Sequence, residues 1–137
     1  MADEFKLEIE TELPISFTKA TGLAVEQGQI MELADNMTAI AATADDFVGG
    51  IVHTEVTAAE ASPSVSLYRG GYFTGTASTA IGFGQTLAMT GSGNRLKPSA
   101  VGNVGGKTVG TALQSAAGNG DKFLYELSPG VQVNAFT

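Results

Sequence analysis

The feature that most constrains the fold of this chain is an order of apolar runs and glycines that occurs twice. The two stretches cover residues 24–68 and residues 80–125. Three blocks match between them: Ala24-Val25-x-x-Gly28-Gln29 with Ala80-Ile81-x-x-Gly84-Gln85, Val48-Gly49-Gly50 with Val104-Gly105-Gly106, and Leu67-Tyr68 with Leu124-Tyr125. The separation is 56 residues for the first two blocks and 57 for the third. This places one inserted residue in the loop-like segment 115–120, where extra length is tolerated. The pattern predicts two similar β units of about 56 residues, with chance similarity in a sequence rich in alanine and glycine as the alternative.

Short apolar runs, each followed by turn residues, make up both units. The chain has 18 glycines and 4 prolines, and a glycine inside a helix costs about 1 kcal/mol relative to alanine. Turn residues recur about every 8–12 residues, a spacing typical of a β-sandwich or a small barrel. We therefore predict an all-β fold, a small glycine-rich, β-tulip-like barrel or sandwich. A short amphipathic helix over residues 24–33 is the alternative for that stretch, although Gly28 lies in its middle.

Two pairs of adjacent glycines interrupt apolar segments of the predicted units. The first pair is Gly49-Gly50 and the second is Gly105-Gly106. A strand that lacks side chains at such positions can bend sharply or let another backbone approach closely. We predict that the two pairs form equivalent β-bends, which would let each small sheet curl closed.

The N-terminal segment has the clearest strand pattern in the sequence. Residues 5–13 alternate apolar and charged side chains, which is the signature of a strand with one buried face, and Pro14 then ends the strand or confines it to a sheet edge. We expect residues 1–21 to form an extended arm and connector, followed by a single β domain over residues 22–137. A partner's sheet edge could accept the arm as an added strand, and pairing within the chain is the alternative. The apolar face of this predicted contact arm holds Phe5, Leu7, Ile9 and Leu13.

Charge and composition exclude several classes of function. The net charge of −7 argues against binding to phosphate backbones, so we expect no nucleic-acid partner. Residues 1–60 hold twelve acids and two bases, whereas residues 61–137 hold two acids and five bases. This asymmetry fits a solvated acidic face or head-to-tail contact between copies. The absence of cysteine, of a signal-peptide pattern and of an 18-residue apolar run predicts a protein made in the cytoplasm without a membrane span.

The motifs that could carry chemistry are incomplete. The segment 102–108 resembles a phosphate-binding loop, but Val101 occupies the position that requires glycine. His53 is the single histidine, and a strand would place it on the same face as Glu55. Adjacent Asp45 and Asp46 favour a turn rather than a metal site. We predict no catalytic residue, metal or cofactor, with a small hydrolase or ligand-binding barrel that uses His53 and Glu55 as the alternative.

Gly28-Gln29, residues 48–51 and Leu67-Tyr68, together with the alternating arm, carry a family resemblance. On these residues the chain resembles the head-decoration or capsid cement proteins of tailed bacteriophages. The resemblance implies a compact β-barrel body, often a homotrimer, that is bound to the major capsid protein on the outer surface of the virion and stabilises the coat lattice. Another virion component, such as a tail or baseplate subunit, is the alternative.

Overall fold

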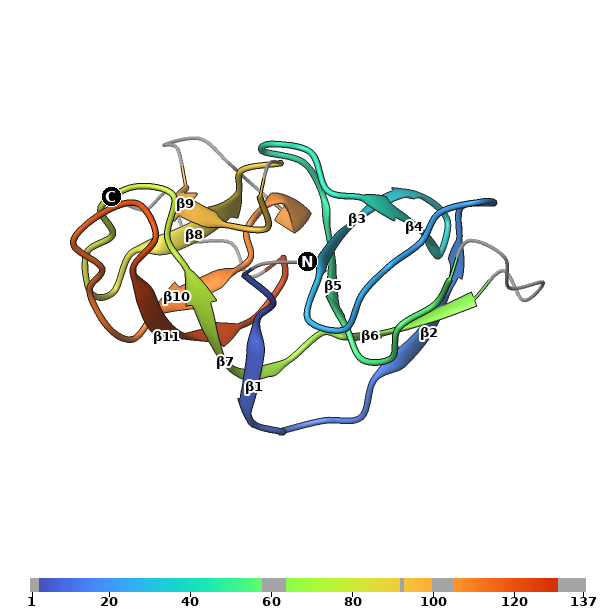
Figure 1. Cartoon of the computed structure of the whole chain (residues 1–137), viewed down its shortest axis with the longest axis horizontal. Coiled ribbons are helices and arrows are strands. Elements are labelled where there is room, and N and C mark those ends of the chain that lie inside the picture. The colour runs from blue at the N-terminus through green and yellow to red at the C-terminus, as the bar shows by residue number, and fades with distance from the viewer. Residues whose placement is uncertain (1–2, 58–63, 92, 100–104, 131–137) are drawn as a thin grey trace.

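The computed structural model describes residues 3–57, 64–91, 93–99 and 105–130, and in this part of the chain the regular structure is strands and one 3₁₀ turn. The predicted all-β fold is confirmed. Two lobes lie side by side, with the N-terminal strand against the lobe that holds the C-terminal half (Figure 1). The elements are β1 (Lys6–Ile9), β2 (Ile15–Lys19), β3 (Ile30–Asp35), β4 (Thr38–Ala41), β5 (Val48–Val52), β6 (Ser64–Tyr68), β7 (Gly71–Thr76), β8 (Thr86–Met89), β9 (Leu96–Pro98), η1 (Gly105–Lys107), β10 (Gly110–Ala112) and β11 (Lys122–Leu127).

The first unit is a closed barrel in which the strands follow the order β2-β4-β3-β5-β6. The β2–β4 pair is parallel, and the other pairs are antiparallel. Alternate side chains of these strands point inward and form one apolar cluster, because successive residues of a strand face opposite sides. The cluster contains Phe17, Met31, Ala39, Val52, Val65 and Leu67 from the strands, and Val25 and Val56 from an isolated bridge.

The second unit repeats this topology with β7, β11, β10, β8 and β9 as consecutive neighbours. In the first unit, the same path around the barrel reads β2, β6, β5, β3 and β4. A parallel bridge between Ala77 and Leu96 joins the ends of β7 and β9, as the β2–β4 pair does in the first unit. The two units therefore have the same strand order and the same strand directions at the closing contact.

The glycine turns that opened the sequence repeat are structurally equivalent. Gly28 and Gly84 have φ values of 85° and 83°, a left-handed conformation that glycine adopts without steric cost. The Gly28 amide donates to the carbonyl oxygen of Val52, and the Gly84 amide to that of Ala112, both at 2.9 Å. In the two turns the side-chain oxygen of the glutamine that follows the glycine accepts a hydrogen bond from the backbone amide three residues before it. The match of Gly28-Gln29 with Gly84-Gln85 thus corresponds to the same local structure.

The predicted match between the two glycine pairs is wrong. Gly105 and Gly106 lie in η1, and the residue equivalent to Gly50 is Gly110. A Cβ atom at Gly50 would collide with the carbonyl oxygen of Tyr68, and one at Gly110 would collide with the carbonyl oxygen of Glu126. The reason for the shift is loop length, because eleven residues separate β9 from β10 whereas six separate β4 from β5. Close backbone approach was correctly expected at Gly50. In the second unit it occurs at Gly110, which lies outside the matched sequence blocks.

The third predicted match is displaced by one residue. Val52 pairs with Leu67 in the first unit, and its equivalent Ala112 pairs with Tyr125 in the second. Leu67 therefore corresponds to Tyr125 rather than to Leu124. A shift of one residue exchanges the two faces of a strand, and the burial follows the structural register, because Leu67 and Tyr125 are both fully buried.

The structure also differs from the predicted connector between the arm and the body. Residues 15–19 form β2, which pairs with β6 inside the first barrel. The arm itself pairs with β7 of the same chain, so the intrachain alternative is the one observed. Residues 24–33, for which a short helix was the alternative, contain the Gly28 turn and the start of β3. Residues 131–136 also alternate apolar and polar side chains, which predicts a final strand, but they lie outside the described residues.

One apolar core joins the two units. Ile30, Ile51 and Tyr68 point out of the first barrel and pack with the core of the second unit, which includes Phe73 and Tyr125. Burial of apolar surface contributes about 25 cal/mol per Å², so this shared core fixes the orientation of one unit against the other.

Candidate interaction surface

The inner end of the N-terminal arm is part of the shared core. Phe5 is 4% exposed, and its ring contacts the ring of Tyr125 edge to face with the centroids 5.8 Å apart. The Phe5 amide donates to the carbonyl oxygen of Gly28 at 2.9 Å, so the arm touches both units. Leu7 is half-buried against the same core. Of the four residues predicted to contact a partner, these two are used inside the molecule.

Polar contacts hold the arm in the same position. The Asp3 carboxylate accepts a hydrogen bond from the Arg95 guanidinium at 2.9 Å, and the buried Asn94 amide donates to the backbone oxygens of Asp3 and Gly28 at 2.8 and 3.2 Å. Asn94 also accepts from the amide of Ile30 at 2.9 Å. A buried amide with three such bonds links the arm, the first barrel and the second unit, and sequence reasoning missed it because its partners are distant along the chain.

Two tyrosines beneath the arm have perturbed acidity. Burial raises the pKa of Tyr68, and its hydrogen bond to Glu10, with 2.9 Å between the oxygens, raises this pKa further. Burial alone raises the pKa of Tyr125 well above its usual value. Burial lowers the pKa of Arg69, opposed by the charge of Glu12. Both tyrosines are therefore neutral at physiological pH and act as packing groups.

The outer end of the arm is exposed. Ile9 and Leu13 are 57% and 77% exposed, and Ile15 at the start of β2 is 44% exposed. We call these three residues the apolar edge strip: Ile9 ends β1, Leu13 lies in the connection that follows, and Ile15 begins β2. The connection between β1 and β2 runs from one lobe to the other (Figure 1). Ile9 and Leu13 were predicted as contact residues, whereas Ile15 was missed. Its signal was the alternation of Ile15 and Phe17, which continues the pattern of the arm beyond Pro14.

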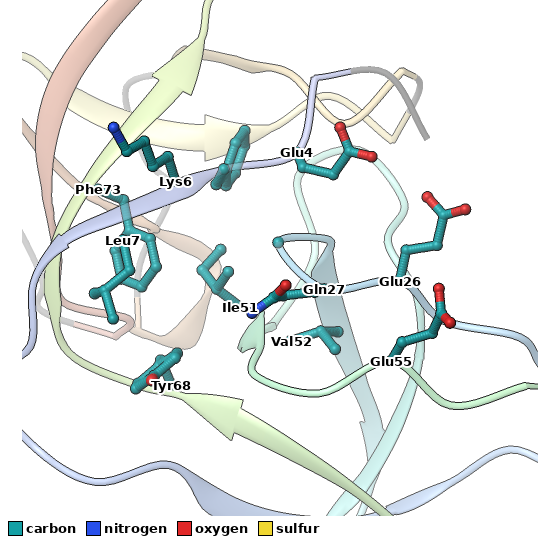
Figure 2. Close-up of a pocket in the computed structure, with 12 residues that line it drawn as sticks. Glu4, Lys6, Leu7, Glu26, Gln27, Ile51, Val52, Glu55, Tyr68 and Phe73 are labelled. Atoms are coloured by element: carbon teal, nitrogen blue, oxygen red, sulfur yellow. The ribbon is translucent and has the colours of Figure 1, made fainter.

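A cleft of about 630 Å³ lies under the arm between the two units. Figure 2 shows Glu4, Glu26 and Glu55 on one side of this cleft and apolar side chains such as Leu7 and Phe73 on the other. Among the described residues, no group of three histidine, cysteine or acidic side chains has the geometry to hold a metal ion. The residues that line the cleft come from the arm and from both units.

The residues of the enzymatic alternative have separate surroundings. The His53 Nδ1 atom lies 2.9 Å from the Thr54 hydroxyl, and the imidazole ring packs edge to face on Tyr68. Glu55 instead lines the cleft. These contacts account for His53 as a packing residue on the barrel.

The other candidate motifs also have structural contacts. The Asp46 carboxylate accepts a hydrogen bond from the Phe47 amide at 2.8 Å, as in a turn, and the carboxylate of Asp45 pairs with the ammonium of Lys97 at 2.7 Å. The candidate phosphate loop falls partly on residues 101–104, which lie outside the described residues. Its Lys107 ammonium sits 5.4 Å from the centre of the Phe47 ring, a cation–π arrangement.

Comparison with known proteins decides the family. The family model for phage cement proteins matches residues 9–127, which is most of the chain. The chain belongs to the phage cement protein family. This membership agrees with the resemblance read from the sequence, and it implies a structural protein of the phage capsid. No curated protein sequence matches the chain.

A solved structure shows the same fold. The head fiber N base of bacteriophage phi29 superposes with a TM-score of 0.58 at 14% sequence identity, over 89% of this chain and 99% of that chain. At this identity the likeness establishes the fold, which includes both units. No helix in the described part of the chain is long and apolar enough to cross a bilayer.

Proposed function

We propose that this cement-family protein is a decoration protein, which binds the outer surface of the phage head through the major capsid protein and stabilises the coat lattice. The observation that carries the proposal is the family match over residues 9–127. The duplicated fold supports it, because two units of similar topology held by one core give each copy two related surfaces in a fixed orientation. Contacts that are weak singly become strong together when a lattice presents many of them at fixed spacing.

The apolar edge strip is the surface that best fits the contact. Ile9, Leu13 and Ile15 are large and exposed, and they lie within seven residues of the chain. Exposed apolar groups beside polar residues mark interaction sites, and here the exposed Glu8, Glu10 and Glu12 flank Ile9 and Leu13 in the sequence. Phe5 and Leu7 would support this surface from inside by fixing the arm.

We expect the assembled form to be a homotrimer, which would multiply the number of contacts per particle. Mass measurement in solution tests this part independently, since a monomer at working concentration would contradict it without bearing on capsid binding.

Co-sedimentation with undecorated capsids of the parent phage tests the proposal itself. We expect the protein to pellet with the capsids at a fixed ratio and to raise the temperature at which they release DNA or lose their coat. A double variant, Ile9→Ser with Leu13→Ser, should bind more weakly while its melting temperature stays close to that of the wild type, because both side chains are exposed. Failure of the wild-type protein to bind any capsid surface would overturn the proposal.

A further inference from the structure

The two units differ at one sheet edge. In the second unit, β1 pairs with the outer edge of β7, with Lys6 opposite Thr74 and Leu7 opposite Phe73. The equivalent residues of the two units follow from the pairing of β7 with β11 in the second unit and of β2 with β6 in the first. Phe73 pairs with Tyr125 and Ile15 pairs with Leu67, so Ile15 corresponds to Phe73.

The equivalent edge in the first unit lies along residues 14–16 of β2. On one side, Ile15 and Ser16 pair with β6. On the other side, the pairing with β4 is confined to Thr18 and Lys19. Among the residues that the structure describes, none pairs with the β4-facing edge of residues 14–16.

The direction of the backbone groups shows what this edge offers. The Thr18 amide donates to the carbonyl oxygen of Met37, on the β4 side, at 2.7 Å. Backbone groups two residues apart in a strand point the same way, so the Ser16 amide and carbonyl also face outward on that side. Pro14 contributes a carbonyl oxygen but no donor. The edge can therefore pair with a short strand, and the proline limits pairing with longer ones.

The edge of β7, which β1 covers, is more buried than the equivalent edge of β2, as expected if the first unit lacks a strand there. Phe73, which β1 and the arm cover, is 1% exposed, whereas its equivalent Ile15 is 44% exposed. The second unit shows what such an edge accepts, namely an extended segment with the pattern Lys-Leu-Glu-Ile. The first unit has the same edge and an uncovered apolar side chain beside it.

We propose that the edge of β2 over residues 14–16 binds an extended strand of the capsid subunit by antiparallel addition. The proposal rests on the function proposed above and identifies the kind of segment that the apolar edge strip contacts. Apolar side chains at alternate positions of the incoming strand would cover Ile15 and Leu13.

Charge indicates the partner. Residues 8–16 hold three glutamates and no lysine or arginine. Glu8 and Glu10 accept hydrogen bonds from the neutral hydroxyls of Thr74 and Tyr68, so these bonds leave their negative charges in place. The corresponding strip of a second copy would be repelled, whereas a coat segment with lysine or arginine beside its apolar residues would be attracted.

Backbone exchange and one proline substitution test the inference on the full-length protein. Hydrogen exchange of residues 13–18 is compared between the free protein and the protein bound to undecorated capsids, and we expect the Ser16 amide to become protected on binding. Ser16→Pro removes the outward donor and should weaken capsid binding by about tenfold or more, as expected for one or two lost hydrogen bonds and a blocked edge. Ser16→Ala is the matched control, because it keeps the amide and should bind as the wild type does.

A side-chain pair separates this edge from other exposed apolar sites. Ile15→Lys should also weaken binding, while Phe83→Lys, at a residue 74% exposed on a turn of the second unit, should not. If capsids bind the wild type without protecting residues 13–18, the edge proposal is wrong and capsid decoration still stands. If the wild type fails to bind capsids, the proposed function falls first. Protection of residues 13–18 in concentrated protein without capsids would show that a second copy fills the edge, which also overturns the proposal.

Discussion

The first and second units share a topology but use their outer faces differently. Strand pairing makes Ile30 equivalent to Thr86, Ile51 to Thr111 and Tyr68 to Glu126. The three residues of the first unit are buried against the second unit, whereas their equivalents are half-buried and polar. Leu67 and its equivalent Tyr125, by contrast, are both fully buried. At these positions the inner pattern is kept in both units, and the outer pattern decides which face of a unit joins the other unit.

The largest expected effect comes from two equivalent glycines, one in each unit, at which neighbouring strands approach most closely. Gly50→Ala and Gly110→Ala each drive a Cβ atom into a backbone carbonyl that pairing holds in place. We expect each substitution to lower the free energy of unfolding by about 4 kcal/mol or to prevent folding. Urea unfolding followed by circular dichroism measures this. If either substitution lowered the free energy of unfolding by less than about 1 kcal/mol, Gly50 and Gly110 would not be equivalent.

The two glycine turns offer a sharper comparison because the arm covers only one of them. A Cβ atom at Gly28 would lie 2.8 Å from the backbone oxygen of Phe5, whereas one at Gly84 meets nothing within 4 Å. Both residues have positive φ, so alanine costs about 1 kcal/mol at either turn. We expect Gly28→Ala to cost about 3 kcal/mol in total because it also displaces the arm. If urea unfolding gave the same loss of stability for Gly28→Ala and Gly84→Ala, the contact between the arm and the Gly28 turn would contribute no stability.

A single substitution can give one unit the outer-face residue of the other unit. Ile51→Thr gives the first unit the residue of the second and should cost about 2 kcal/mol, since it replaces a buried ethyl group by a hydroxyl. The reverse substitution, Thr111→Ile, should change the free energy of unfolding by less than about 0.5 kcal/mol, because that face is half-buried. Thermal unfolding of both variants measures the difference. Similar losses would mean that the outer faces do not distinguish the units.

The smallest expected effect concerns the contact between Tyr68 and the arm. Tyr68→Phe removes the hydrogen bond to Glu10 and should cost about 1 kcal/mol near neutral pH. Because the folded protein raises the pKa of this phenol, the wild-type advantage is fully present below the ordinary tyrosine pKa and declines as pH rises through the raised value. Urea unfolding at pH 7 and above pH 10 checks the sign. An advantage that grows at high pH would contradict it.

Sequence patterns were reliable where the physical cause was local. The Gly28 and Gly84 turns were matched correctly because positive φ and the glutamine contact involve only a few adjacent residues. The match at Gly105-Gly106 failed because the structural equivalent, Gly110, is defined by the strand it crosses rather than by its neighbours. In the predicted contact arm, alternation identified a strand correctly but assigned Phe5 to a partner surface, whereas it lies in the core.

The sequence by itself determined that the chain forms short strands joined by glycine turns, that these occur as two similar units, and that the first residues are extended. Alternation and turn chemistry suffice for this, because they act over a few residues. Only the tertiary structure decided that β1 pairs with β7 of its own chain, and that the matching edge at Ile15 and Ser16 is open in the first unit. A strand's own residues specify its two faces, but the neighbour along its edge is chosen by packing between segments far apart in the chain.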